Sequence, residues 1–183
     1  DLVDEHVKTK KNHEFSIQQK ILADNNSDKN QFLAIDMEYQ FEQKSIKERT
    51  ENKTRFDIVA IDLANNKIVL LELKQGFASS DGNSGVLDHI KKYQEHINHL
   101  EFSASLIADI KSILRQKELL GIYQFTTKAI IENLCNSSID FKVIFAYKTI
   151  EEKERYKKKY GNDGKTLFIN TSTQKYIIKT DDI

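Results

Sequence analysis

The sequence predicts an α/β domain in which helices flank a central mixed sheet. Some segments repeat apolar residues with the period of a helix, and others alternate them with the period of a strand. These segments follow the order helix, three strands, helices, strand, helix and strands, which is typical of a sheet covered by helices. With 183 residues, of which 39% are hydrophobic, one domain has enough apolar side chains for its core.

One helix and three strands are predicted in the first half of the chain. Residues 13–24 carry a partial helical stripe of apolar side chains. Residues 32–41 alternate apolar and polar side chains, which predicts a strand. The apolar runs 56–63 and 67–74 predict two more strands, joined by Ala64-Asn65-Asn66. Asn favours such a turn because it tolerates positive φ.

The second half of the chain adds helices and strands after a Gly- and Ser-rich loop at 76–85. Apolar residues at helical spacing indicate the helices, and short apolar runs indicate the strands. The predicted helices are 87–100, 106–114, 128–134 and 150–160, and the predicted strands are 141–147, 166–170 and 175–179.

Composition and charge exclude several classes of protein. The 28 basic and 28 acidic residues give no net charge, which argues against a nonspecific polycation. The single cysteine, Cys135, excludes a disulfide scaffold and a cysteine-based zinc site. No stretch approaches the ~18 apolar residues of a membrane span, and no signal peptide opens the chain. We therefore expect no membrane partner, a cytoplasmic location and one domain over residues 1–183. The start at Asp1 rather than Met is what we expect of a piece of a longer protein.

Three charged residues stand inside the apolar strands of the predicted hairpin. Asp57 lies in the first strand, and Glu72 and Lys74 lie in the second. A charge inside an apolar strand is costly unless it is paired or bound to a metal. The hairpin is therefore the strongest candidate for a functional site.

The register of the hairpin decides whether these side chains meet. We expect a two-residue turn at Asn65-Asn66, which places Lys74 opposite Asp57. Asp57 and Glu72 then become diagonal neighbours on one face, roughly 7–8 Å apart at Cα. A four-residue turn keeps all three side chains on one face, whereas a three-residue turn separates them. On one face, the two carboxylates can converge on one cation.

Two carboxylates beside a lysine suit a hydrolytic metal site. Mg²⁺ prefers a few carboxylate oxygens and keeps several waters. A neighbouring ammonium group holds or deprotonates an attacking water and offsets the negative charge that builds on a phosphate. These groups together predict phosphodiester hydrolysis. The alternative is a structural ion pair between Asp57 and Lys74 at the end of the sheet.

The pattern of Asp57, fourteen residues and then Glu72-Leu73-Lys74 across a hairpin resembles the PD-(D/E)XK nuclease superfamily. The resemblance covers about residues 12–100 and the strand 141–147. It implies the restriction-endonuclease-like fold, a three-layer αβββαβ core with a central mixed sheet flanked by helices. Phe56 stands where the family name has its Pro.

The resemblance also implies roles for the hairpin residues. Asp57 and Glu72 would bind Mg²⁺, for which Mn²⁺ is an expected substitute, and the carbonyl oxygen of Leu73 would be a further ligand. Lys74 would position the nucleophilic water.

Helical residues complete the implied site. The acidic residue of the family's first helix would be Glu14, and Glu38 on the first strand is the alternative. Many members carry Gln and Tyr four residues apart on the helix after the E-x-K strand, whereas here Tyr93 and Gln94 are adjacent. Gln94, or the nearby Lys92, is still expected to reach the site from the helix.

These observations predict a Mg²⁺-dependent nuclease that acts on nucleic acid, DNA rather than RNA. The basic stretches Lys44–Arg55 and Lys142–Lys165 are either phosphate contacts or solvated faces. The alternatives are an inactive module of the same fold that binds nucleic acid or protein, and a plain scaffold. A second copy of the chain or further domains are the other expected partners. Catalysis requires Asp57, Glu72 and Lys74 to share an open face with room for a cation, a binding module requires only the basic surface, and a scaffold would bury that face under a helix.

Overall fold

The computed structural model of the protein describes residues 10–42, 53–76, 93, 97, 100–161 and 164–180. The described elements follow the predicted order, and most ends differ from the predicted ones by three residues or fewer. The helix predicted at 106–114 is longer and runs from residue 100 to residue 119. The elements are α2 (Lys10–Asp24), β1 (Phe32–Glu42), β2 (Lys53–Asp62), β3 (Lys67–Gln75), α4 (Leu100–Leu119), α5 (Lys128–Asn133), the short 3₁₀ helix η2 (Leu134–Asn136), β4 (Ile139–Tyr147), α6 (Ile150–Tyr160) and β5 (Thr166–Asn170).

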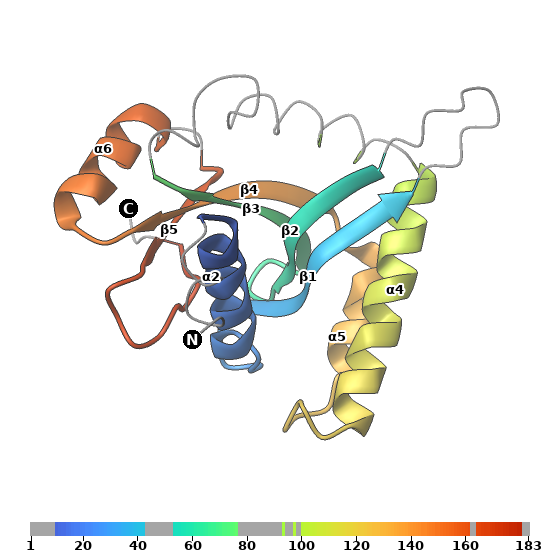
Figure 1. The fold of residues 1–183 in the computed structure, drawn as a ribbon. Coiled ribbons are helices and arrows are strands. Elements are labelled where there is room, and N and C mark those ends of the chain that lie inside the picture. Colours follow the sequence, from blue (N-terminus) through green and yellow to red (C-terminus); the bar gives the residue numbers. More distant parts are fainter. Residues whose placement is uncertain are drawn as a thin grey trace.

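The five strands form one mixed sheet with helices on both faces, so the predicted α/β class is confirmed (Figure 1). The strand order is β1-β2-β3-β4-β5. The pairs β1–β2 and β2–β3 are antiparallel, and the pairs β3–β4 and β4–β5 are parallel. The change from antiparallel to parallel pairing therefore takes place at β3.

Two apolar cores lie on the two faces of the sheet. On one face, Ile17 and Ile21 of α2 pack with Leu71 and Leu73 of β3. On the other face, α4 and Tyr156 of α6 pack on Val59, Ile68 and Leu70. The core residues of α4 are Phe102, Leu106, Ile110 and Leu114. Because both faces are covered, the apolar run of β3 is buried continuously rather than at every second residue. Strand alternation then places the side chains of Glu72 and Lys74 on the α4 and α6 face.

The hairpin between β2 and β3 has a four-residue turn rather than the expected two-residue turn. Asp62 pairs with Lys67, so residues 63–66 form the connection. The Asp62 carboxylate accepts hydrogen bonds from the amides of Ala64 and Asn65 at 3.1 and 3.2 Å, and Asn66 adopts a positive φ of 51°. The side chain of Asp62 thus stabilises the longer turn, which keeps the predicted parity of the two strands.

The predicted strand at 175–179 is wrong, because this segment is irregular. It is held by a side chain instead of a strand ladder: Asn25 donates to the carbonyl of Tyr176 at 2.8 Å and accepts from the amide of Ile178 at 2.9 Å. Of the predicted helix 87–100, the structure describes Tyr93, Ile97 and Leu100, and all three are helical. No helix in the described ranges has the length and apolar character to cross a membrane.

Candidate active site

The candidate site lies where β2 and β3 separate. The paired residues end at Ile58 and Leu71, although both strands continue beyond this pair and diverge (Figure 1). Past the last pair, the amide of Leu73 donates a hydrogen bond of 2.8 Å to Asp57 Oδ2. A carboxylate therefore takes the place of a backbone acceptor. The observed register continued by one residue puts Asp57 opposite Glu72, rather than opposite Lys74 as expected.

Glu72 is held through both of its carboxylate oxygens. Lys74 Nζ lies 2.7 Å from Oε1, and the Tyr93 hydroxyl donates to Oε2 over 2.7 Å. The expected alternative, an ion pair of Asp57 with Lys74, is wrong about the partner, because Lys74 pairs with Glu72. No ion pair joins Asp57 to any residue in the described part of the chain.

Tyr93 is a site residue that the sequence did not reveal, because its position on an apolar helical stripe is typical of a core residue. Its hydroxyl also lies 3.2 Å from the carbonyl oxygen of Arg55. Its ring packs on Phe56 and Phe141, with centroids 4.7 and 4.5 Å away. Burial and the nearby Glu72 carboxylate raise the pKa of Tyr93, so the phenol stays protonated and donates. The available signals were that a buried tyrosine hydroxyl needs a partner and that the resembled family carries a Tyr on this helix.

Glu14 reaches the site from the opposite helical layer. The N-terminal part of α2 lies beside β3 (Figure 1), and the Glu14 side chain is half-buried. Burial is the main cause that raises the pKa of Glu14, and the charges of Lys74 and Glu72 act on it most strongly among its neighbours. The structure therefore brings the predicted helical acid to the predicted hairpin residues.

Glu38, the alternative acid on the first strand, has a different partner. It forms an ion pair of 2.8 Å with Arg55 and adopts a positive φ of 56°. The opposite charges of Glu38 and Arg55 neutralise each other at the border of the site. Gln94 and Lys92, which we expected to reach the site, lie outside the described residues.

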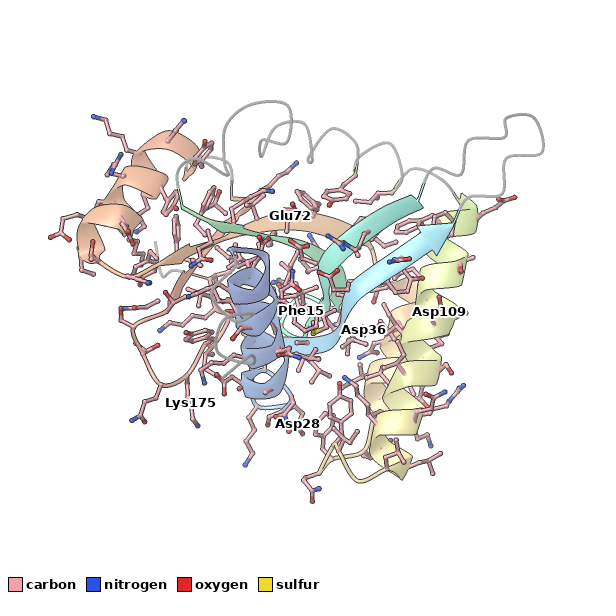
Figure 2. The ribbon with its side chains drawn as sticks, viewed as in Figure 1. Phe15, Asp28, Asp36, Glu72, Asp109 and Lys175 are labelled. Atoms are coloured by element: carbon pink, nitrogen blue, oxygen red, sulfur yellow. The ribbon has the colours of Figure 1, made fainter. Side chains whose placement is uncertain are left out.

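The three hairpin side chains are enclosed, which differs from the open face expected for catalysis and is the arrangement expected of a scaffold. Asp57, Glu72 and Lys74 are 7%, 4% and 8% exposed, and Figure 2 shows Glu72 near the centre of the molecule. Burial raises the pKa of Asp57 to about 8, and the Glu72 carboxylate acts in the same direction. The Leu73 amide opposes this shift because it stabilises the ionised form.

The donor atoms of this cluster are all hard oxygens. Within the described ranges, no group of three or more His, Cys, Asp or Glu side chains is arranged to hold a metal ion. The expected ligand set is smaller, with the carboxylates of Asp57 and Glu72 and the carbonyl of Leu73. The peptide of Leu73 lies against Asp57, since its amide bonds that carboxylate. Such a set fits Mg²⁺, which completes its coordination with water, and it does not fit zinc.

Comparisons of the chain with protein-family models, with curated proteins and with solved structures found no match. The resemblance to the PD-(D/E)XK superfamily therefore depends on the residues of this chain alone.

Proposed function

We propose that this protein is a Mg²⁺-dependent nuclease that hydrolyses phosphodiester bonds of nucleic acid, with DNA as its substrate. The observation that carries the proposal is a charge imbalance. Among the residues that the structure describes, Asp57 and Glu72 are buried with one cation, Lys74, which contacts Glu72, and the half-buried Glu14 adds a third carboxyl group. A structural ion pair needs one carboxylate for each lysine. The excess buried negative charge calls for a proton or a metal cation.

The fold supports the same proposal. A helix, three antiparallel strands, helices and a strand parallel to β3 follow each other in the αβββαβ order of the restriction-endonuclease-like core. The site residues lie where such an arrangement separates its second and third strands.

Asp57, Glu72 and the Leu73 carbonyl would hold the Mg²⁺ ion. When bound, Mg²⁺ acidifies a coordinated water and neutralises charge on a phosphate. The chain fixes the two carboxylates in advance, because the Leu73 amide holds Asp57 and the Tyr93 hydroxyl holds Glu72. Little reorganisation is then needed at the moment of reaction.

Lys74 would act on the water and the phosphate. Its ammonium group contacts Glu72 Oε1, so it lies at the ligand rather than in solvent. From there it orients an attacking water and stabilises the negative charge that develops on the phosphate oxygens. Burial of the three side chains strengthens these electrostatic interactions because bulk water is excluded.

The test is calorimetric titration with Mg²⁺ and Mn²⁺, with plasmid cleavage measured in parallel. Asp57→Asn should remove metal binding and cleavage. Asp62→Asn is the matched control, because Asp62 is equally buried at the other end of β2 and should leave both unchanged. Absence of metal binding by the wild type, even with DNA present, would overturn the nuclease proposal and favour the inactive binding module.

A further inference from the structure

The second half of α6 concentrates positive charge. Arg155, Lys157, Lys158 and Lys159 lie within five residues, and no acidic residue lies among them. Arg155, Lys158 and Lys159 are exposed, and Lys157 is half-buried. Nitrogen-tipped side chains extend from α6 away from the sheet in Figure 2. We call these four residues the α6 basic surface.

The packing of α6 places this surface on the same face of the sheet as Glu72 and Lys74. Lys74 of β3 pairs with Phe145 of β4, and partners in a parallel pair point to the same side. The Phe145 ring stacks on Tyr156 and Tyr160 of α6, with centroids 4.5 and 4.9 Å away.

A hydrogen bond also ties α6 to the strand that carries the site. The Tyr156 hydroxyl accepts from the amide of Gly76, which lies two residues after Lys74. Tyr156 is buried, so this contact fixes the helix beside the end of β3.

Aromatic rings restrain the lysines of this surface. Lys157 Nζ lies 6.0 Å from the ring centroid of Phe168, and Lys159 Nζ lies 5.2 Å from that of Tyr160. A lysine stem held on a ring loses less conformational entropy when its ammonium group binds an anion.

Helix stability alone does not account for the α6 basic surface. Acidic residues in the first turn and basic residues in the last turn do match the helix dipole. Glu151 and Glu154 stand four residues before Arg155 and Lys158, which is the favourable order for charge pairs on a helix. Lys157 and Lys159 instead follow basic residues at that spacing, which is unfavourable. A bound polyanion would reduce the repulsion between these like charges.

We propose that the α6 basic surface binds the phosphate backbone of the nucleic acid whose scissile bond lies at Glu72 and Lys74. The proposal rests on the proposed nuclease function for its ligand. A surface of this kind has a measurable signature, since each phosphate that it neutralises releases counterions. The logarithm of the affinity then falls with the logarithm of salt concentration, with a slope of about −0.9 for each contact on duplex DNA.

The test compares two triple variants of the full chain. Lys157→Gln, Lys158→Gln and Lys159→Gln remove three charges from α6. Lys29→Gln, Lys128→Gln and Lys175→Gln remove three charges from exposed lysines elsewhere, and Figure 2 shows Lys175 far from Glu72 in this view. Binding of a fluorescein-labelled DNA duplex is measured by anisotropy in Ca²⁺ over a series of NaCl concentrations. Thermal unfolding checks that both variants fold.

We expect the α6 variant to lose about tenfold in affinity near physiological salt, and its salt slope to become shallower by about two. The salt slope of the control variant should differ from the wild-type slope by less than one. Equal slopes in the two variants would overturn the inference.

The metal titration separates this inference from the nuclease proposal. If the protein cleaves DNA with metal but the α6 variant keeps the wild-type salt slope, the nuclease proposal stands and the inference about α6 fails. If the salt slope is shallower in that variant but the wild type binds no metal, the α6 basic surface still binds nucleic acid and the nuclease proposal fails.

Discussion

The protonation of Asp57 links the site to the stability of the protein. Its pKa is near 8 in the folded chain and 3.8 for the ordinary side chain, because burial disfavours the ionised form. The native state therefore binds more protons than the unfolded state between these pH values, and the contribution of Asp57 to stability is lost as pH rises through this window. In a metalloenzyme the cation takes the place of that proton.

Asp57→Asn should therefore stabilise the metal-free protein at alkaline pH. Each unit of pKa difference corresponds to about 1.4 kcal/mol, so we expect a gain of roughly 2 kcal/mol or more at pH 8 and little change at pH 4. Urea unfolding across this range measures the difference. Asp62→Asn is the control, and parallel pH profiles for the wild type and Asp57→Asn would contradict the prediction.

Tyr93→Phe should weaken metal binding while the fold is kept. The substitution removes the donor to Glu72 Oε2 and leaves the ring contacts in place. We expect about a tenfold loss of metal affinity and a destabilisation of about 1–2 kcal/mol. Tyr123→Phe is the matched control, because Tyr123 is a buried tyrosine that donates to the carbonyl of Ala34. It should lose similar stability with unchanged metal affinity. Equal metal affinities for all three proteins, measured by calorimetry, would exclude a positioning role for Tyr93.

At the scale of elements, the hairpin sets the geometry of the site through its turn. The Asp62 carboxylate binds two amides of the turn and the side chain of Asn65, the latter at 2.8 Å. The four-residue turn puts Asp57 directly across from Glu72, whereas a two-residue turn would shift the register by two residues and put Asp57 across from Lys74.

Asp62→Ala should destabilise the protein by about 1–3 kcal/mol, because three hydrogen bonds disappear and turn amides lose their acceptor. Chemical denaturation measures the loss. Metal affinity should fall far less than in Asp57→Asn, since the strand pairing downstream of the turn still fixes the register. A variant as stable as the wild type would show that the turn does not depend on this side chain.

The elements differ in how far the sequence predicts them. The ends of α6 follow from local signals, since Thr149 and Glu152 form a capping box at its start. The alternation of side chains along the two strands is enough to predict that Asp57, Glu72 and Lys74 share one face of the hairpin. The turn length does not follow from this alternation, because it depends on bonds from Asp62. The apolar residues of the segment 175–179 predict a strand, but the segment is ordered by Asn25, about 150 residues away in the sequence.

The residues of the candidate site also differ in how far the sequence predicts them. Asp57, Glu72 and Lys74 could be found because charges in apolar strands are conspicuous. Glu14 was found only through the family resemblance, as nothing in its own segment indicates that α2 reaches the separated strands. The pairing of Lys74 with Glu72 and the role of Tyr93 depend on tertiary contacts that no local pattern encodes.

For the whole molecule, metal binding should be coupled to pH and to thermal stability. A cation that displaces one proton from Asp57 should bind about tenfold more tightly for each pH unit gained, until the pH reaches about 8. A metal at 100 times its Kd should also stabilise the fold by about 2.7 kcal/mol. Calorimetry at several pH values and melting curves with and without Mn²⁺ measure both effects. A pH-independent affinity would show that Asp57 is not the group that exchanges its proton.

The junction of the antiparallel and parallel halves at β3 has a consequence for biosynthesis. The ribosome makes β1, β2 and β3 as a continuous meander, but the parallel neighbour β4 follows only roughly 60 residues later. At roughly 5–20 residues per second, one edge of β3, whose run Ile68–Leu71 is apolar, stays unpaired for several seconds. The nascent chain is therefore most prone to aggregation in this interval, and the strand that carries Glu72 and Lys74 is the one that a chaperone would need to shield.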